Sequence, residues 1–169
     1  FYGWTNKNGV QTHESTVWVP SGIDTSIFNG GDGTLENPYE IANEKQLRDF
    51  AVSLTAKCDY SGIYIKLVND IDVSSKEWTA IGEGEYAFDG KFDGDNHTIS
   101  GISIGTAENP YEDDGTKVYF GLFGVLGKNA EVKNLSLCRT SIYVSSKVSD
   151  FVGGLVGFAD GCTIDNVYV

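Results

Sequence analysis

The chain has 169 residues, 40% of them hydrophobic, and a formal net charge of −12, which suits one folded domain or one domain with an appendage. So strong an acidic balance argues against nucleic acid as a partner, because its phosphates require lysine and arginine. No apolar run approaches the length of a membrane-spanning segment, so we expect no membrane insertion.

Residues 1–30 contain the aromatic residues Trp4, Trp18 and Phe28 but show no clear hydrophobic period. A segment without helical or strand periodicity gives no sign of an amphipathic element with its own buried face. We therefore predict that residues 1–30 are an extended segment or strand that packs on the rest of the chain.

Residues 31–60 hold a lead-in segment and a short helix. Asn43 has the side chain of a helix N-cap, and Gln46 stands three residues later, a variant of the capping box. We expect the helix to cover the apolar end and the unpaired first edge of the strands that follow. Its apolar stripe has helical spacing and comprises Leu47, Phe50, Ala51 and Leu54.

Residues 61–169 contain a six-residue pattern four times. Each copy reads apolar, any residue, then Asp, Gly or Asn, then apolar, any residue, apolar. The third position holds residues that tolerate a left-handed backbone, which predicts a one-residue bend between two short strands. Copies about 32 residues apart indicate stacked units. The four copies are residues 68–73, 99–104, 132–137 and 164–169.

Stacking these bends one above another would bury their apolar positions and pair the strands in parallel. Two further apolar pairs flanked by glycines, at residues 121–124 and 154–157, suit a second short strand in the same layers. The sequence thus predicts an all-β fold of about four layers with one short helix before it. We also expect the array to continue beyond Val169, whose strand would otherwise leave an open edge.

The acidic residues are concentrated in residues 83–114, which hold nine acids and one lysine. Asp89, Asp93 and Asp95 are close enough in sequence to bind Ca²⁺ or to act as paired carboxylates. Each of them also lies beside a glycine, so the alternative is that they form turns. His97 likewise suits a turn better than a general base. We expect no cofactor, with Ca²⁺ as the one weak candidate.

Three cysteines leave an odd count and no zinc-ligand spacing. A disulfide between Cys138 and Cys162 is one alternative, and three packed, unpaired thiols, including Cys58, are the other, which we favour.

An inserted segment around residues 107–117 is the loop best suited to recognition, because binding residues often lie on loops of a rigid scaffold. Within it, residues 108–112 repeat residues 36–40 letter for letter as Glu-Asn-Pro-Tyr-Glu. The offset of 72 is no multiple of the repeat, and the sequence gives no reason for the echo.

Several motifs together resemble bacterial surface proteins that carry GLUG motifs. The resemblance covers about residues 28–169, with two departures: Ala80, where the family more often has proline, and the long insertion. The motifs that carry it lie at residues 31–41, 69–72, 78–82, 88–99, 121–124 with 132–135, and 153–157 with 164–167.

The resemblance implies a right-handed parallel β-helix in a secreted or surface-anchored bacterial protein. Members are similar to adhesin-like proteins and to regions beside the peptidase unit of immunoglobulin-A-cleaving metalloproteases. The peptidase chemistry does not transfer, because this chain has no His-Glu-x-x-His motif.

Three function classes remain open. The first, which we favour, is a non-catalytic surface module that acts as an adhesin or spacer, with a host or cell-surface protein or glycan and other domains of its own polypeptide as partners. The second is a carbohydrate-binding module that uses Tyr111, Tyr119 or Tyr143 as stacking rings. The third is a polysaccharide-cleaving enzyme built on the acidic turns.

Overall fold

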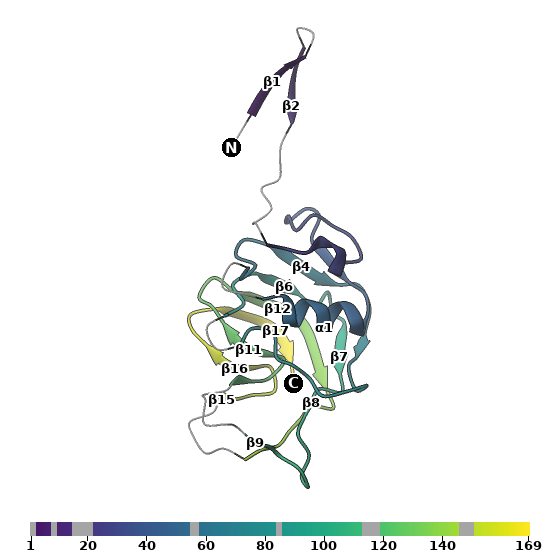
Figure 1. The fold of residues 1–169 in the computed structure, drawn as a ribbon, viewed down its shortest axis with the longest axis vertical. Helices are drawn as coiled ribbons and strands as arrows, with labels where there is room; N and C mark the ends of the chain where they lie inside the picture. The colour runs from purple at the N-terminus through teal and green to yellow at the C-terminus, as the bar shows by residue number, and fades with distance from the viewer. Residues whose placement is uncertain are drawn as a thin grey trace.

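The structure is a computed structural model that describes residues 3–7, 10–14, 22–54, 58–83, 86–112, 119–145 and 151–169, with side-chain surroundings from residue 22 onward. It is mostly β, with one α-helix (Figure 1). Within these ranges, every strand pairing is parallel except that of β1 with β2. The predicted all-β class with parallel strands is thus confirmed.

The first elements are β1 (Gly3–Lys7), β2 (Val10–Glu14), the 3-10 helix η1 (Thr25–Ile27), β3 (Tyr39–Ile41), α1 (Glu44–Ser53), β4 (Tyr64–Leu67), β5 (Ile71–Asp72), β6 (Lys91–Asp93), β7 (Thr98–Ser100) and β8 (Ser103–Ile104). The later strands are β9 (Tyr111–Glu112), β10 (Tyr119–Phe120), β11 (Phe123–Leu126), β12 (Glu131–Cys138), β13 (Ser141–Ile142), β14 (Val144–Ser145), β15 (Phe151–Val152), β16 (Val156–Ala159) and β17 (Thr163–Tyr168).

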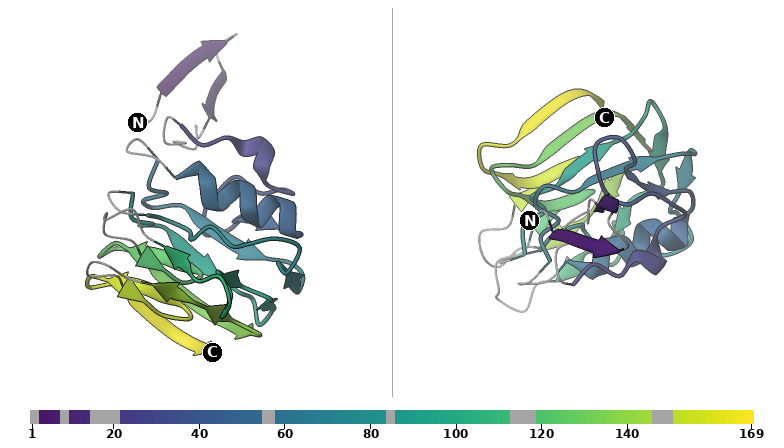
Figure 2. Two further views of the ribbon diagram at one scale, coloured as in Figure 1. Left: turned by 60° about the horizontal axis from the view of Figure 1, so that its bottom comes forward. Right: turned by 90° about the horizontal axis from the view of Figure 1, so that it is seen from above.

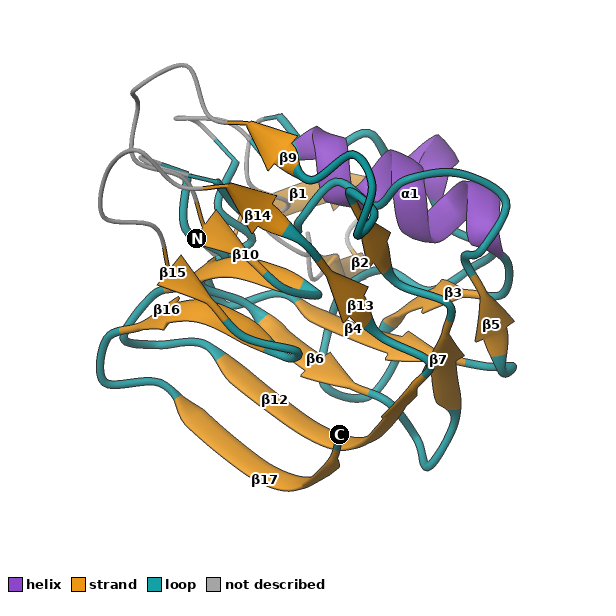
Figure 3. Cartoon of the chain, turned by 90° about the horizontal axis from the view of Figure 1, so that it is seen from below, coloured by secondary structure: helices purple, strands orange, loops and turns teal. Residues whose placement is uncertain are grey.

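The largest sheet has seven strands in the order β3-β4-β6-β12-β7-β5, with β17 also paired to β12 (Figure 3). Strand β12 belongs to two rows, because its first half pairs with β6 and its second half with β7. Between the halves, Asn134 has a φ of 51°, so the strand bends there. One long strand thereby joins two rows of short ones.

The smaller sheets repeat the same succession of strands. β13 pairs with β8, β14 with β9, β15 with β10 and β16 with β11, all in parallel. One passage of the chain through this succession of strands is called a circuit. Each strand from β12 to β16 therefore lies beside the corresponding strand of the circuit before it. Figure 2 shows these layers succeeding one another from α1 towards the C-terminus.

The four copies of the six-residue pattern do not stack in one column, so this prediction is wrong. The last two copies are in register, with Val132 opposite Ile164. The copy at residues 99–104 instead begins opposite Leu137, which is paired with Ile99. The reason is that two different corners of each layer need the same local pattern, apolar residues on both sides of a bend. Layers of unequal length then bring unlike copies together.

The predicted bend residues are confirmed in three copies, because Gly101, Asn134 and Asn166 have φ values of 80°, 51° and 51°. The prediction is wrong for Asp70, which is not among the described residues with positive φ. Its carboxylate instead accepts a 2.8 Å hydrogen bond from the backbone N–H of Thr98. The aspartate there joins two layers through its side chain and needs no left-handed backbone.

The predicted helix is confirmed as α1. The Asn43 side chain accepts a 3.0 Å hydrogen bond from the N–H of Gln46, whose own side chain accepts one of 2.8 Å from the N–H of Ala42. Leu47, Phe50 and Ala51 are buried on the inner face of the helix. Figure 2 shows α1 lying across the strand layers on the side nearest the N-terminal segment.

The core beneath α1 is rich in aromatic rings. Phe50 contacts Phe28, Tyr60, Phe88 and Phe92, with ring centroids between 5.0 and 6.3 Å away. Of the predicted segment 1–30, residues Ile27 and Phe28 are therefore packed on the rest of the chain. For residues 1–21, the predicted packing lies outside the described side chains.

All three cysteines are free, which confirms the prediction of unpaired thiols, and Cys138 and Cys162 form no disulfide. The prediction that all three are packed is wrong for Cys138, which is exposed, whereas Cys58 is buried. Burial raises the pKa of the Cys58 thiol. Within the described part of the chain, no helix combines the length and the apolar character that crossing a membrane requires.

Candidate functional site

The outer face of the large sheet carries charges of alternating sign. Side chains of a strand alternate between two faces, and the inward positions of β4 and β6 are Ile65, Leu67 and Phe92, all buried. The residues between them point outward. Across successive strands, one outward column is formed in register by Glu40, Lys66, Asp93, Lys133 and Asp165.

Neighbours in this column form ion pairs. The Nζ atom of Lys66 lies 3.2 Å from Oε1 of Glu40, and Nζ of Lys133 lies 3.8 Å from Oδ2 of Asp93. Lys133 also donates to Glu131 at 3.0 Å, and this hydrogen bond is the main reason that its pKa is raised. Opposite charges on facing strands stabilise the pairing register. These ion pairs therefore stabilise the sheet, whether or not the column also binds a ligand.

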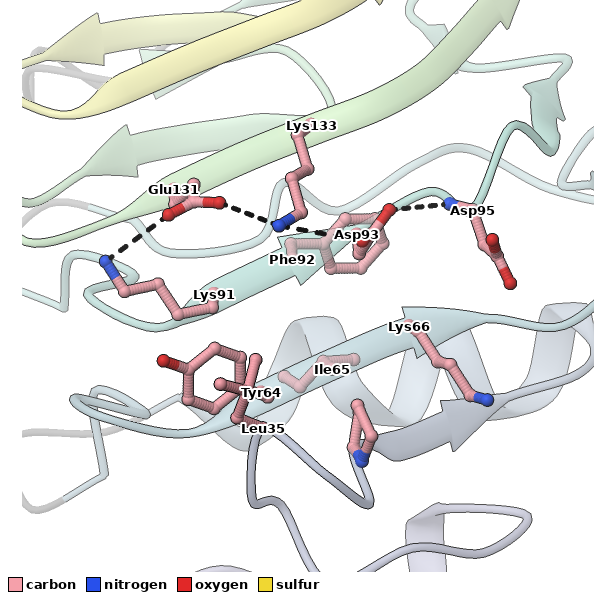
Figure 4. A pocket seen from close by; sticks show the side chains of 11 residues that line it. Leu35, Tyr64, Ile65, Lys66, Lys91, Phe92, Asp93, Asp95, Glu131 and Lys133 are labelled. Atoms are coloured by element: carbon pink, nitrogen blue, oxygen red, sulfur yellow. Dashed lines mark hydrogen bonds and ion pairs between the residues drawn. The ribbon is translucent and has the colours of Figure 1, made fainter.

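A shallow hollow of about 170 Å³ opens on this face. Figure 4 shows Tyr64 and Leu35 on one side of it and the charged side chains of β6 and β12 on the other. Leu35 is 61% exposed, and Tyr64 is half-buried at the start of β4. The hollow thus has an apolar part, formed by Leu35, Pro38 and Tyr64, and charged side chains from β6, from β12 and, as Lys66, from β4.

The polar groups of the hollow are held in place by the sheet. Lys91 donates a 2.8 Å hydrogen bond to the carbonyl of Asn129 and lies 3.8 Å from Glu131. Asp93 accepts hydrogen bonds from the backbone N–H of Asp95 at 2.9 Å and from the side-chain amide of Asn134 at 3.0 Å. Ordered donors and acceptors of this kind can orient the polar groups of a ligand.

Of the three predicted aspartates, Asp93 and Asp95 line the hollow together, whereas Asp89 is not part of its lining. Asp89 precedes β6 and binds the backbone N–H and the side-chain amide of Asn129, at 2.9 and 2.7 Å. Asp93 ends β6, and Asp95 follows it with a φ of 49°, in a turn. Among the described residues, no group of three or more His, Cys, Asp and Glu side chains is arranged to hold a metal ion. The geometry supports the turn-forming alternative for these aspartates.

Two of the three predicted tyrosines lie close together. Tyr111 and Tyr143 are 40% and 44% exposed, and the backbone N–H of Tyr111 donates to the carbonyl of Tyr143 at 2.8 Å. Tyr119 lies apart, on β10, where its ring stacks on Phe151 at 5.2 Å. Phe158 meets both rings edge-on. The tyrosines therefore form no single line of stacking rings.

Of the recognition loop, residues 107–112 are described and residues 113–118 lie outside the described part. His97 lies 3.2 Å from the Asp70 carboxylate in a turn. Hydrogen bonds from the Thr98 backbone and His97 lower the pKa of Asp70. This pair joins neighbouring layers, as expected for a turn residue.

Sequence reasoning missed Tyr64 and the lysines of the hollow. The available signal was the outward alternation Tyr64-x-Lys66, Lys91-x-Asp93 and Glu131-x-Lys133 around buried apolar residues. That alternation shows which side chains share a face of their own strand. It does not show which strands are neighbours, and the hollow is made by three strands together.

No protein-family profile matches the chain. The chain is similar to a "Putative Gly-rich membrane protein" of Evansella cellulosilytica, at 37% identity over 152 residues, which cover 86% of this chain and 16% of that protein. It is also similar to "Halomucin" of Haloquadratum walsbyi, at 30% identity over 182 residues, covering 95% of this chain and 2% of that protein. The chain thus spans only a small part of these relatives.

Among solved structures, the chain is similar to one described as a "putative immunoglobulin A1 protease from Bacteroides ovatus". The match has a TM-score of 0.49 and 28% sequence identity, and it covers 68% of this chain and 30% of that one.

Proposed function

We propose that this chain is a non-catalytic module of a secreted or surface protein, in which a right-handed parallel β-helix presents its outer face to other molecules as an adhesin or spacer. The observation that carries the proposal is the repeated circuit, in which strands β12 to β16 each pair with the strand of the previous circuit. Such stacking gives an extended, stiff surface suited to presentation.

The relatives support an extracellular or cell-surface location. One is named as a membrane protein and the other as a halomucin, and both are far longer than this chain. The resemblance to GLUG-motif surface proteins points the same way. An acidic, strongly charged surface also suits a soluble module exposed to the medium.

The absence of catalysis is part of the proposal. A carboxylate that acts as general acid or base needs to reach the substrate, whereas Asp89 and Asp93 are each engaged by an asparagine side-chain amide. The third function class, a polysaccharide-cleaving enzyme, would need these two carboxylates to face a common substrate. They lie towards opposite ends of β6, with Asp89 two residues before the strand and Asp93 at its last position.

Adhesion to immobilised surface glycoproteins and polysaccharides tests this function. We expect saturable retention of the purified chain on at least one such surface, with no new reducing ends or peptide fragments released. Release of products would favour the enzyme. No retention on any surface would reduce the proposal to a spacer.

A further inference from the structure

We propose that the hollow between β4, β6 and β12 binds an uncharged polysaccharide chain, with Tyr64 as its stacking ring. This inference rests on the adhesive form of the proposed function and names the site and the ligand class. It differs from the sequence-based expectation, which assigned stacking to Tyr111, Tyr119 and Tyr143.

The charge balance of the hollow favours a neutral ligand. Its lining contains three lysines and three acids, so their formal charges cancel, although the whole chain carries −12. An anionic glycan would meet long-range repulsion from the chain and lysines already paired with acids. Of the three acids, Asp93 and Glu131 are paired with Lys133 and Lys91, so a cationic peptide that bound them would leave a lysine without its partner. The lysines and acids are Lys66, Lys91, Lys133, Asp93, Asp95 and Glu131.

The mixed character of the walls favours a sugar over an apolar peptide. A pyranose ring has one face of C–H groups and a rim of hydroxyl groups that both donate and accept hydrogen bonds. The Tyr64 ring, with Leu35 and Pro38 beside it, offers an apolar surface to the C–H face. Hydroxyl groups can add hydrogen bonds to the lysine and carboxylate pairs without separating them.

The spacing of the sheet suits an extended polymer. Neighbouring strands lie about 4.8 Å apart, close to the length of one sugar unit in an extended chain. A polysaccharide that crosses β4, β6 and β12 would therefore meet a new row of donors and acceptors with each successive unit. Lys91 on β6 and Glu131 on β12 are opposite each other and supply such groups, and the Tyr64 ring is opposite Lys91 on β4.

Calorimetry on the full chain tests the site, with a neutral probe, cellohexaose, and an anionic probe, hexagalacturonate. We expect cellohexaose to bind with little dependence on ionic strength and Tyr64→Ala to weaken it at least about tenfold. Tyr64→Phe retains the ring and should bind like the parent. Tyr168→Ala, which removes an exposed ring elsewhere, is the matched control. Thermal melts of all variants exclude a loss caused by unfolding.

The outcomes separate this inference from the function on which it rests. Unchanged cellohexaose binding by Tyr64→Ala would overturn the site. Preference for hexagalacturonate, weakened by salt, would overturn the ligand class. Failure to bind either probe by a chain still retained on glycoprotein surfaces would overturn the inference and leave adhesion in place. Failure on every surface would remove both the inference and the adhesive form of the function, and would leave the spacer.

Discussion

Two stretches of this chain have nearly the same sequence and turn but different surroundings. Residues 33–40 and 105–112 both read Gly-Thr-x-Glu-Asn-Pro-Tyr-Glu. In the first, Thr34 Oγ1 accepts a hydrogen bond from the N–H of Asn37 at 3.2 Å; in the second, Thr106 Oγ1 accepts one from Asn109 at 3.0 Å. Each turn then leads into a strand that begins at the tyrosine.

The tyrosines that follow these turns differ in burial. Tyr39 is 2% exposed and stacks on Phe28 at 4.4 Å, whereas Tyr111 is 40% exposed and meets Phe120 edge-on at 5.1 Å. The echo thus has a local cause, a turn that starts a strand, and its offset need not match the layers. The comparison teaches that eight residues determine the turn, while the elements packed around it determine the burial of the tyrosine.

The largest expected effect comes from truncating the buried ring. Tyr39→Ala should lower the free energy of unfolding by about 3–5 kcal/mol, because it leaves a cavity among packed aromatic rings. Tyr111→Ala should cost less than about 1 kcal/mol, since its ring is partly in water already. Urea denaturation of both variants measures the difference. Equal losses would mean that the two tyrosines have similar surroundings.

The next effect concerns α1, whose Phe50 packs against the same Phe28 ring that stacks on Tyr39. Arg48 donates to the carbonyls of Val73, Lys76 and Glu77 at 2.6–2.8 Å, which ties α1 to the loop after β5. Arg48→Ala should cost about 1.5–3 kcal/mol in thermal or chemical unfolding. The control is Arg139→Ala, which removes an exposed ion pair and should cost less than about 1 kcal/mol. A reversed order would contradict this assignment.

A substitution at Gly105 distinguishes the contribution of the backbone turn from that of the Tyr111 ring in residues 105–112. Gly105 has a φ of 62°, and a Cβ atom there would lie 2.4 Å from the carbonyl oxygen of Tyr143. Gly105→Ala should therefore cost at least about 1–2 kcal/mol, more than Tyr111→Ala although both are in the same turn. Chemical denaturation of the two variants ranks them. If the ring mattered more than the backbone, the order would invert.

The threonines test whether the two turns are equivalent. Thr34→Val and Thr106→Val each remove the hydroxyl that accepts the asparagine N–H, so each should cost about 0.5–1.5 kcal/mol. We expect the larger loss at Thr34, because its hydroxyl also donates a 2.7 Å hydrogen bond to the Asp32 carboxylate, whereas the second turn has Ile104 at that place. Side-by-side melts with Thr34→Ser and Thr106→Ser as controls check this. Equal losses at the two sites would mean that the hydrogen bond to Asp32 adds nothing to the stability of the first turn.

The smallest effect is a pH dependence confined to the first turn. Hydrogen bonds from the Thr34 hydroxyl and backbone lower the pKa of Asp32, and the second turn has Ile104 at that place. A lowered folded-state pKa means stabilisation that is present above the ordinary pKa of 3.8 and is lost as the pH falls below it. Carboxyl NMR titration should place Asp32 below 3.8. Loss of the shift in Thr34→Val would confirm the cause.

The local elements were predictable from sequence. The Asn43 cap, the apolar stripe of α1 and the left-handed residues Gly101, Asn134 and Asn166 all follow from side-chain chemistry within a few positions. The stacking of the copies was not predictable in the same way. The paired residues Phe92 and Val132 are much farther apart along the chain than the paired residues Ile65 and Phe92. No single period therefore describes the layers.

In the candidate site, too, the local features were predictable from sequence and the contacts between strands were not. The alternation in β4, β6 and β12 marks Tyr64, Lys91 and Lys133 as outward residues. Their meeting in one hollow depends on the register between strands, which is set by the lengths of the connecting loops and by the packing of the inward residues. The predicted tyrosines were chosen by residue type alone, and they lie on other strands.

The sequence by itself determined where this chain bends, where its helix begins and which side chains alternate, because steric limits on the backbone and hydrogen bonds to near neighbours act within a few residues. Only the tertiary structure decided which bends lie above one another, which of two identical turns buries its tyrosine, and that the alternating charges of β4, β6 and β12 form one surface. Those outcomes depend on contacts between residues far apart in the chain, and the layers between them differ in length.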